Sequence, residues 1–249
     1  MADSRRVVLV TGAQQGIGAA MAVAFAAAGA DVAINWLDDE AAAQQVADAV
    51  RAQGAEALLV PADVSKVDQA RGMVDQVVAW KDRLDVLVNN AGVFPRVPFL
   101  EMSEAEWDFV IGVNLKGTNF CAQAAAWAMI ERNIQGAIIN LSSRSMAGAP
   151  LGVHYSATKA GVVGLTRSMA LALAQYRIRV NAIAPGLTDT AQPRYGNTEE
   201  EIQDMARATP LGRMGTPEDI AGLGVFLASD AAAWITGQVY HINGGSYMG

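Results

Sequence analysis

Short apolar runs alternate along this chain with longer, alanine-rich stretches of helical periodicity, and that alternation constrains the fold more than any other feature. The runs are continuously apolar, so each predicted strand is buried on both faces, as in a parallel sheet covered by helices. Strand–helix alternation over the whole length predicts an α/β fold with a doubly wound (Rossmann-type) parallel sheet of about seven strands. The predicted strands are residues 7–10, 32–34, 57–60, 85–88, 137–140, 179–182 and 239–242, and the predicted helices are about 17–28, 40–53, 67–80, a long one before 137, and 156–174.

The sequence shows no internal division. It contains no proline- or glycine-rich linker, charge block or repeat, which favours a single domain over residues 1–249. The most irregular stretch, about Gly186 to Glu199, contains Pro193 and Gly196 and few periodic apolar residues. It follows the sixth strand, where a doubly wound sheet opens its ligand crevice. We therefore interpret it as a mobile lid rather than a domain boundary.

Composition excludes several kinds of site and partner. The single cysteine, Cys121, rules out an internal disulfide framework, and with two histidines in the chain no metal site is expected. The net charge of −7 argues against nucleic acid or an anionic membrane as a partner. Val7 to Ala30 carries no charge and is long enough to span a bilayer, but Gln14, Gln15 and several glycines interrupt it. We expect no targeting segment and no membrane association, which leaves the cytoplasm as the default location.

A glycine-rich loop directly follows the first predicted strand and opens a helix. Gly12 permits a tight turn, Gly16 lets the backbone approach a pyrophosphate, and Gly18 lets the helix pack close to the sheet. The N–H groups and positive dipole end of that helix favour phosphate. A plain strand–helix turn that happens to need glycines is the competing interpretation. The position after the first strand of a doubly wound sheet favours dinucleotide binding.

Several motifs in order resemble the short-chain dehydrogenase/reductase family over essentially the whole chain. They are Thr11-Gly12-x-x-x-Gly16-x-Gly18, Asn89-Asn90-Ala91-Gly92, Asn114 in Val113-Asn114-Leu115, Ser142 with Tyr155 and Lys159, Pro185-Gly186-Leu187-Thr188-Asp189-Thr190, and Ile242-Asn243-Gly244-Gly245. Within that family the pattern is similar to bacterial sugar (glucose) 1-dehydrogenases and to 3-oxoacyl-[acyl-carrier-protein] reductases. The resemblance implies a nicotinamide-dependent oxidoreductase that interconverts a secondary alcohol and its carbonyl.

The spacing of two residues explains the chemistry expected. Tyr155 and Lys159 are four apart on one helix face. A free tyrosine has a pKa of about 10. A nearby ammonium favours the phenolate and lowers that pKa, so Tyr155 can act as acid or base. Ser142 would hydrogen-bond the reacting oxygen as charge develops. The resemblance implies that Lys159 also binds the nicotinamide ribose and that Asn114 helps to hold a water relay. Taken singly, these residues have ordinary structural interpretations: a helical surface pair, a strand-end cap and a turn residue.

The resemblance also implies a cofactor site, whose specificity is set after the second strand. NAD-preferring relatives often carry aspartate at the position of Trp36, and NADP-preferring ones arginine at Leu37 or a base at Gln15. This chain has neither, and Asp38 and Asp39 would repel a 2′-phosphate, so NAD(H) is favoured over NADP(H). Asp63 matches an adenine-contacting position, although it could instead cap the following helix. The implied cofactor residues are Gly12, Gln14, Gln15, Gly16, Ile17, Gly18, Trp36, Leu37, Asp63, Val64, Asn90, Ala91, Gly92, Tyr155, Lys159, Pro185, Gly186, Thr188 and Thr190.

Substrate residues are the least specific part of the sequence pattern. Arg96, Arg144 and His154 flank substrate positions of the family and would suit a polar or anionic substrate such as a sugar, a hydroxy acid or a carrier-linked acyl group. Each arginine could equally be a solvated surface charge. Because the sequence lacks the basic residues typical of NADP-preferring relatives, it favours an NAD-linked dehydrogenase of a sugar, polyol or hydroxy compound. Carrier-linked 3-oxoacyl reduction is the alternative.

A catalytically silent dinucleotide-binding regulator is the remaining alternative, although such proteins usually lose part of the catalytic set. The resemblance further implies a homotetramer, assembled through the helices around 107–130 and 156–174 and the C-terminal strand. Small residues in those helices permit close packing, as at Ala125 and Gly161.

Overall fold

The computed structural model describes residues 5–248, and the predicted parallel sheet is present there with seven strands. Its order is β3-β2-β1-β4-β5-β6-β7, and every neighbouring pair is parallel. All four residues of β1 are buried, as expected for a strand covered on both faces. The strands are β1 Val7–Val10, β2 Asp31–Trp36, β3 Ala57–Pro61, β4 Val86–Asn89, β5 Ala137–Leu141, β6 Arg179–Pro185 and β7 Val239–Ile242.

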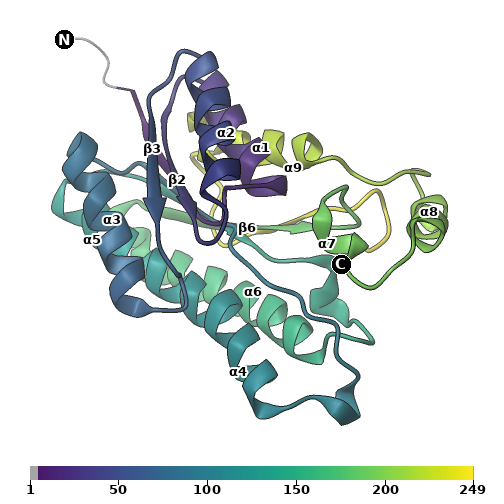
Figure 1. Ribbon diagram of the computed structural model, residues 1–249. Coiled ribbons are helices and arrows are strands. Elements are labelled where there is room, and N and C mark those ends of the chain that lie inside the picture. The colour runs from purple at the N-terminus through teal and green to yellow at the C-terminus, as the bar shows by residue number, and fades with distance from the viewer. Residues whose placement is uncertain (1–4, 249) are drawn as a thin grey trace.

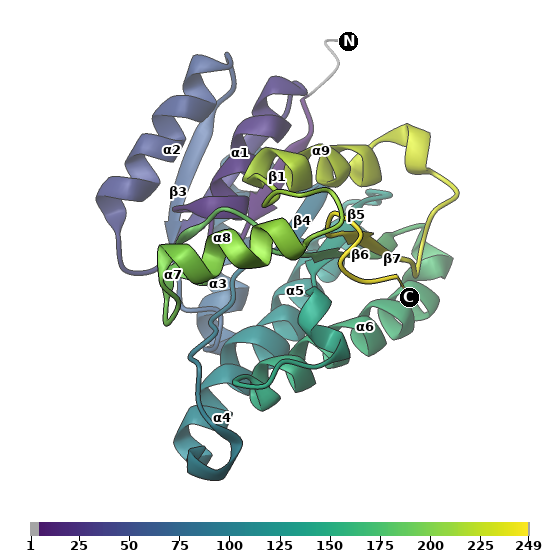
Figure 2. The same ribbon diagram turned by 90° about the vertical axis from the view of Figure 1, so that its right-hand side faces the viewer.

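Helices form a layer on each face of the sheet (Figures 1 and 2). On one face, α1, α2 and α9 pack against a core that includes Phe25 and Val10. The opposite core includes Leu9 and Met129 and is covered by α3, α5 and α6, with α4 extending that layer. The α-helices are α1 Gly16–Ala27, α2 Glu40–Ala52, α3 Val67–Lys81, α4 Glu104–Ile111, α5 Thr118–Glu131, α6 Val153–Leu173, α7 Ala191–Arg194, α8 Glu199–Ala208 and α9 Pro217–Ala228. Short 3-10 turns lie at Phe99–Glu101, Arg144–Ala147, Ala174–Tyr176 and Asp230–Ala232.

The helical stretch before β5 differs from the single regular helix expected. A π-helical segment, Gly112–Gly117, joins α4 to α5 and turns Asn114 into the protein interior. Such segments are rare and are often found at functional sites. The irregular stretch after β6 also has more structure than expected, since α7 lies within it and α8 begins at its end. Both helices lie beyond the sheet, apart from the two helical layers (Figure 1).

The strand order fixes where a ligand can bind. The chain winds outward in one direction from β1 to β3 and in the other from β4 to β7, so the order reverses between β1 and β4. Loops leaving the carboxyl ends of those two strands diverge there and leave a crevice. The glycine loop after β1 and the Asn89–Gly92 segment at the end of β4 both lie at this point.

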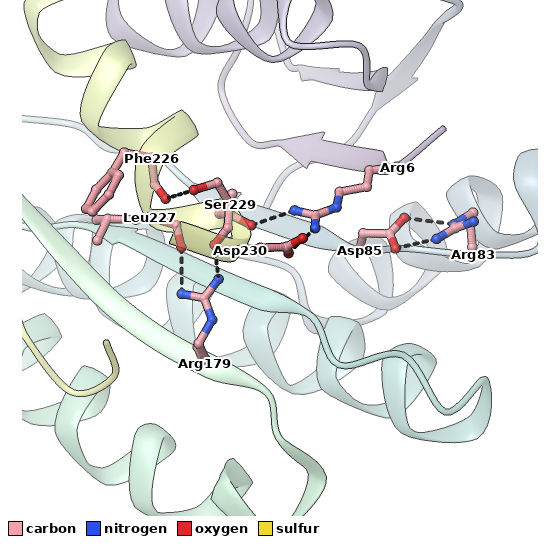
Figure 3. A network of polar contacts seen from close by, with 9 residues as sticks. Arg6, Arg83, Asp85, Arg179, Phe226, Leu227, Ser229 and Asp230 are labelled. Atoms are coloured by element: carbon pink, nitrogen blue, oxygen red, sulfur yellow. Dashed lines mark hydrogen bonds and ion pairs between the residues drawn. The ribbon is translucent and has the colours of Figure 1, made fainter. Parts of the chain in front are cut away.

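At the amino ends of the strands, on the edge of the sheet away from the crevice, arginines contact the end of α9 (Figure 3). Arg179 of β6 donates to the carbonyl oxygens of Leu227 at 2.6 Å and Ser229 at 3.3 Å, where α9 ends. Arg6 donates to the carbonyl of Ala228 at 2.8 Å and contacts Asp230. Helix C-termini leave carbonyls without helical partners, and these two cations satisfy them. The contacts fasten α9 to the sheet beneath it.

Within residues 5–248, no helix is both long enough and apolar enough to cross a membrane.

Loss of the Arg179 contacts should weaken the fold. In Arg179→Met the carbonyls at the end of α9 lose their donor, and we expect the free energy of unfolding to fall by about 1–3 kcal/mol. Urea denaturation followed by circular dichroism measures it. Arg207→Met is the matched control, because it removes an exposed arginine paired with Asp204 and should cost less than about 1 kcal/mol. Equal losses in the two variants would contradict a role for the α9 contacts.

Candidate active site

The glycine loop has the backbone shape that a cofactor cradle requires. Gly12 and Gly16 adopt left-handed φ values of 59° and 57°, which other residues rarely adopt. A Cβ on Gly18 would lie 2.5 Å from the Asn90 Nδ2 atom and 2.6 Å from the Gly12 carbonyl oxygen. The first turn of α1 therefore sits against the loop with no room for a side chain. A dinucleotide pyrophosphate fits such a cradle at the N-terminus of α1.

Hydrogen bonds from the end of β4 hold this loop in place. Asn90 donates through Nδ2 to the carbonyl oxygens of Thr11 and Gly12, both at 2.9 Å. In return the Thr11 hydroxyl accepts from the backbone N–H groups of Asn90 and Ala91, both at 3.0 Å. Asn35 accepts from the Gly12 N–H at 3.0 Å. The two sides of the crevice thus form one hydrogen-bonded unit.

Gln14 connects the loop to the segment after β2. Its amide nitrogen donates to Asp38 at 2.6 Å, and its carbonyl oxygen accepts from the Leu37 N–H at 3.0 Å. Trp36 ends β2, and its indole N–H is buried without a hydrogen-bond partner. Gln15 precedes α1 at the N-cap position, where its side chain makes no capping bond.

Two further cofactor candidates follow β3. Asp63 accepts from the Ser65 N–H at 2.9 Å and forms a local turn, while the cap position of α3 belongs to Lys66. Asp63 is therefore not the helix cap that the competing interpretation required. Val64 is buried against the π-helical segment, where a Cβ on Gly117 would lie 3.0 Å from it.

A cavity of about 730 Å³ at the carboxyl edge of the sheet brings together three of the four predicted catalytic residues. Ser142 follows β5 directly, while Tyr155 and Lys159 lie one turn apart in the first half of α6. The Ser142 hydroxyl donates to the Lys159 carbonyl at 2.8 Å, which fixes its position beside α6. Of the predicted cofactor residues, Ile17, Asn90, Gly92, Tyr155, Lys159, Pro185, Gly186, Thr188 and Thr190 line the same cavity.

Asn114, the fourth predicted member, lies just behind this cavity. Its side chain exchanges two hydrogen bonds with the Val93 backbone, at 2.8 and 2.9 Å, and also donates to Thr158 at 3.4 Å. A Cβ on Gly92 would lie 3.4 Å from the Asn114 Oδ1 atom and 3.6 Å from the Lys159 Nζ atom. Asn114 and Lys159 therefore flank the same small space next to Gly92.

Burial dominates the electrostatics of the tyrosine–lysine pair. Lys159 donates to the Leu141 carbonyl at 2.7 Å, and burial lowers its pKa to about 8. Burial also raises the pKa of Tyr155, against which hydrogen bonds with Gln192 and Ser143 act. The pKa of Tyr155 is therefore raised rather than lowered as expected, because burial is the largest cause. Desolvation disfavours the charged form of each group. The tyrosine therefore keeps its phenolic proton, and the neighbouring lysine ammonium loses its proton more readily than a lysine in water.

The predicted substrate residues divide between the cavity and the interior. Arg96 and Arg144 line the cavity, and Arg96 lies 5.3 Å from the centroid of the Phe94 ring. Phe94 in turn stacks on Tyr155, with ring centroids 4.1 Å apart. His154 is fully buried and does not line the cavity, because its position at the start of α6 turns it inward.

Sequence reasoning missed several cavity residues. Ser143 is one of them and reaches the Tyr155 hydroxyl, as does Gln192 on α7, which lies in the stretch that the sequence predicted to be a lid. Ser143 directly follows Ser142 and could have been noticed as a second hydroxyl. Others come from the end of α8 and the chain end, where no motif marks them: Met205, Thr209 and Ser246.

Comparisons with known proteins agree with this geometry. A family model described as enoyl-(acyl carrier protein) reductase matches residues 12–247. The 3-oxoacyl-[acyl-carrier-protein] reductase FabG of Staphylococcus aureus is 44% identical, over 96% of this chain and 97% of the relative. A (2S)-[(R)-hydroxy(phenyl)methyl]succinyl-CoA dehydrogenase subunit, BbsD of Thauera aromatica, is 41% identical over 98% of both chains.

A solved structure of a short-chain type dehydrogenase/reductase from Mycobacterium marinum superposes with a TM-score of 0.91 at 38% identity. The superposition covers 97% of this chain and 95% of that one. With the cradle, the catalytic cavity and these likenesses together, the chain belongs to the short-chain dehydrogenase/reductase family, oxidoreductases that act on CH–OH groups and ketones.

Proposed function

We propose that this protein is an NAD(H)-dependent enzyme that interconverts a secondary alcohol (a sugar, polyol or other hydroxy compound) and its carbonyl, with Tyr155 as the acid/base. The observation that carries the proposal is the single cavity in which Ser142, Tyr155 and Lys159 meet beside the glycine cradle. A nicotinamide dinucleotide bound there supplies the site that gives or takes a hydride. The complete catalytic set favours an enzyme over a silent regulator.

The chain's own residues account for the proton. In carbonyl reduction Tyr155 donates its phenolic proton to the oxygen, and the raised pKa keeps that proton in place at neutral pH. Ser142, whose hydroxyl donates to the Lys159 carbonyl in the protein alone, turns that O–H to the same oxygen as negative charge develops on it. Lys159, with a pKa of about 8, is largely an ammonium at neutral pH and stabilises the phenolate left behind.

The remaining members of the site position these groups. Asn114 holds the Val93 backbone and shares the space beside Gly92 with Lys159, which suits it to hold a water that returns the proton. Phe94 stacks on the tyrosine ring and limits its movement. Arg96 and Arg144 face the substrate side of the cavity, whereas His154 would act only through its neighbours.

A second candidate is reduction of a carrier-linked 3-oxoacyl group. The Staphylococcus aureus relative carries that name at 44% identity. Both candidates use the same hydride and proton chemistry and differ only in what surrounds the reacting carbon. Turnover of simple alcohols and of 3-oxoacyl thioesters, each with NAD(H) and NADP(H), separates the two.

We also propose a homotetramer formed by a single domain, residues 1–249, that acts in the cytoplasm without a nucleic-acid partner. Large apolar side chains stand exposed on the layer of α4, α5 and α6, with Phe109 54%, Trp127 60% and Leu171 82% accessible. Exposed aromatic and leucine side chains on these helices would be buried if the helices paired with those of another copy. Light scattering at micromolar concentration should give four times the chain mass, and a monomeric mass would refute the assembly.

Removing the phenolic hydroxyl should remove the proton donor and leave the cradle intact. We expect Tyr155→Phe to lower kcat by about 10²–10⁴-fold, the usual contribution of general acid catalysis, with little change in cofactor affinity. Turnover followed at the reduced-nicotinamide absorbance and cofactor binding followed by fluorescence measure the two quantities. Near-normal turnover in this variant would rule out Tyr155 as the acid/base.

The segment after β2 should make the enzyme prefer NAD(H). Gln14 holds the Asp38 carboxylate beside the loop, where it would repel a 2′-phosphate. We expect kcat/KM to be several-fold higher with NAD(H) than with NADP(H). Leu37→Arg should lower the ratio of kcat/KM with NAD(H) to kcat/KM with NADP(H), because a guanidinium can bind the 2′-phosphate of NADP(H) with two hydrogen bonds. A wild-type preference for NADP(H) of several-fold would overturn this prediction.

A further inference from the structure

The catalytic cavity is positively charged in an otherwise acidic chain. Its lining contains three cationic side chains, Arg96, Arg144 and Lys159, and no Asp or Glu is found among the described residues that line it. The chain as a whole has a net charge of −7. A cavity of one sign with apolar walls concentrates counter-ions of the other sign. The charge of the cavity therefore favours an anion.

Of these cations, Arg96 is the one that lines the cavity with a buried guanidinium nitrogen left without a partner. Its Nη1 atom is buried and has no hydrogen-bond partner, and no carboxylate in residues 5–248 forms an ion pair with it. A buried donor without an acceptor is costly, so natural proteins rarely retain one without a reason. Lys159 is held by the Leu141 carbonyl, and Arg144 is exposed at the rim.

The surroundings of Arg96 place its guanidinium beside the aromatic pair formed by Phe94 and Tyr155. The guanidinium carbon lies 5.3 Å from the centroid of the Phe94 ring, and that ring stacks on Tyr155 with centroids 4.1 Å apart. On its other side, Gly196 has a left-handed φ of 81°, and a Cβ there would lie 3.4 Å from the Arg96 Cδ and Nη1 atoms. The guanidinium is thus confined between the catalytic layer and the segment that follows α7.

We propose that Arg96 binds an oxyanion of the substrate, so that the enzyme acts on a hydroxy or oxo compound bearing a carboxylate or phosphate a few bonds from the reacting carbon. The guanidinium fork matches either group. This inference rests on the proposed function, because it assigns the substrate class of the same cavity. It assigns Arg96 to substrate affinity and specificity, and leaves the proton transfer to Tyr155.

Matched pairs of charged and neutral ketones test the assignment. 3-Oxobutanoate is compared with its ethyl ester, and dihydroxyacetone phosphate with dihydroxyacetone, in wild type, Arg96→Gln and Arg96→Lys. For whichever anion is the better substrate, we expect Arg96→Gln to raise KM by about 10- to 100-fold with kcat changed only a few-fold, because a charge-assisted hydrogen bond is lost. KM for the neutral partner should stay constant, and Arg96→Lys should recover part of the loss. The pair that responds distinguishes carboxylate from phosphate.

Controls separate this inference from the proposed function. Arg51→Gln removes an exposed arginine on α2, outside the cavity, and should leave all four KM values unchanged. Equal effects of Arg96→Gln on the anionic and neutral members, or no effect on either, would overturn the inference while the enzyme remains a ketone reductase.

If no ketone in the panel is reduced, that result counts against the proposed function. The inference about Arg96 is then tested by ligand binding instead of turnover. The shift in melting temperature with each compound, in the presence of reduced cofactor, is then compared between wild type and Arg96→Gln. A shift for an anion in wild type that is absent in Arg96→Gln supports the inference. Its absence in both proteins overturns it.

Discussion

The catalytic edge depends on how closely the loop after β1 approaches the end of β4. A Cβ on Gly12 would lie 2.9 Å from the Ala91 Cα atom, and one on Gly18 would overlap the Asn90 amide. That amide fills the space instead and satisfies two carbonyls of the loop. Because Gly92 follows immediately and borders Asn114 and Lys159, the same approach positions the cofactor cradle relative to the catalytic lysine. In the proposed function, this contact would link phosphate binding to proton transfer.

Burial gives this site its chemical character. Desolvation raises the pKa of Tyr155 and lowers that of Lys159 to about 8. Ionisation of either group is therefore less favourable in the protein alone than in water. In the mechanism that we propose, the tyrosine is therefore a proton donor at neutral pH, and the lysine ammonium acts when the phenolate forms. Phe94 connects two of these groups, since its ring stacks on the tyrosine and lies 5.3 Å from the Arg96 guanidinium carbon. Acid/base chemistry and anion selection then share one wall of the cavity.

The sequence predicted the sheet well because buried parallel strands are locally apolar and helices between them have their own periodicity. Strand bounds were correct within about three residues, and the glycine loop was identified because its residues are adjacent in the chain. The π-helical turn at Asn114 was not predicted, since the apolar periodicity of Gly112–Gly117 does not distinguish π-helical from α-helical hydrogen bonding. His154 shows the same limit: proximity to Tyr155 in sequence did not reveal that it points inward. Met205 and Ser246 reach the cavity through long-range packing that no local pattern encodes.

The dependence of carbonyl reduction on the Tyr155–Lys159 pair is the central claim, and a pH profile tests it most directly. The measurement is kcat/KM for carbonyl reduction between about pH 6 and 10, in wild type and in Lys159→Met. The account predicts a wild-type value that is level near neutrality and falls with a midpoint near pH 8, where Lys159 loses its proton. It also predicts a slower variant without that inflection. Identical profiles in the two proteins, or a wild-type value that rises through pH 8, would contradict the account.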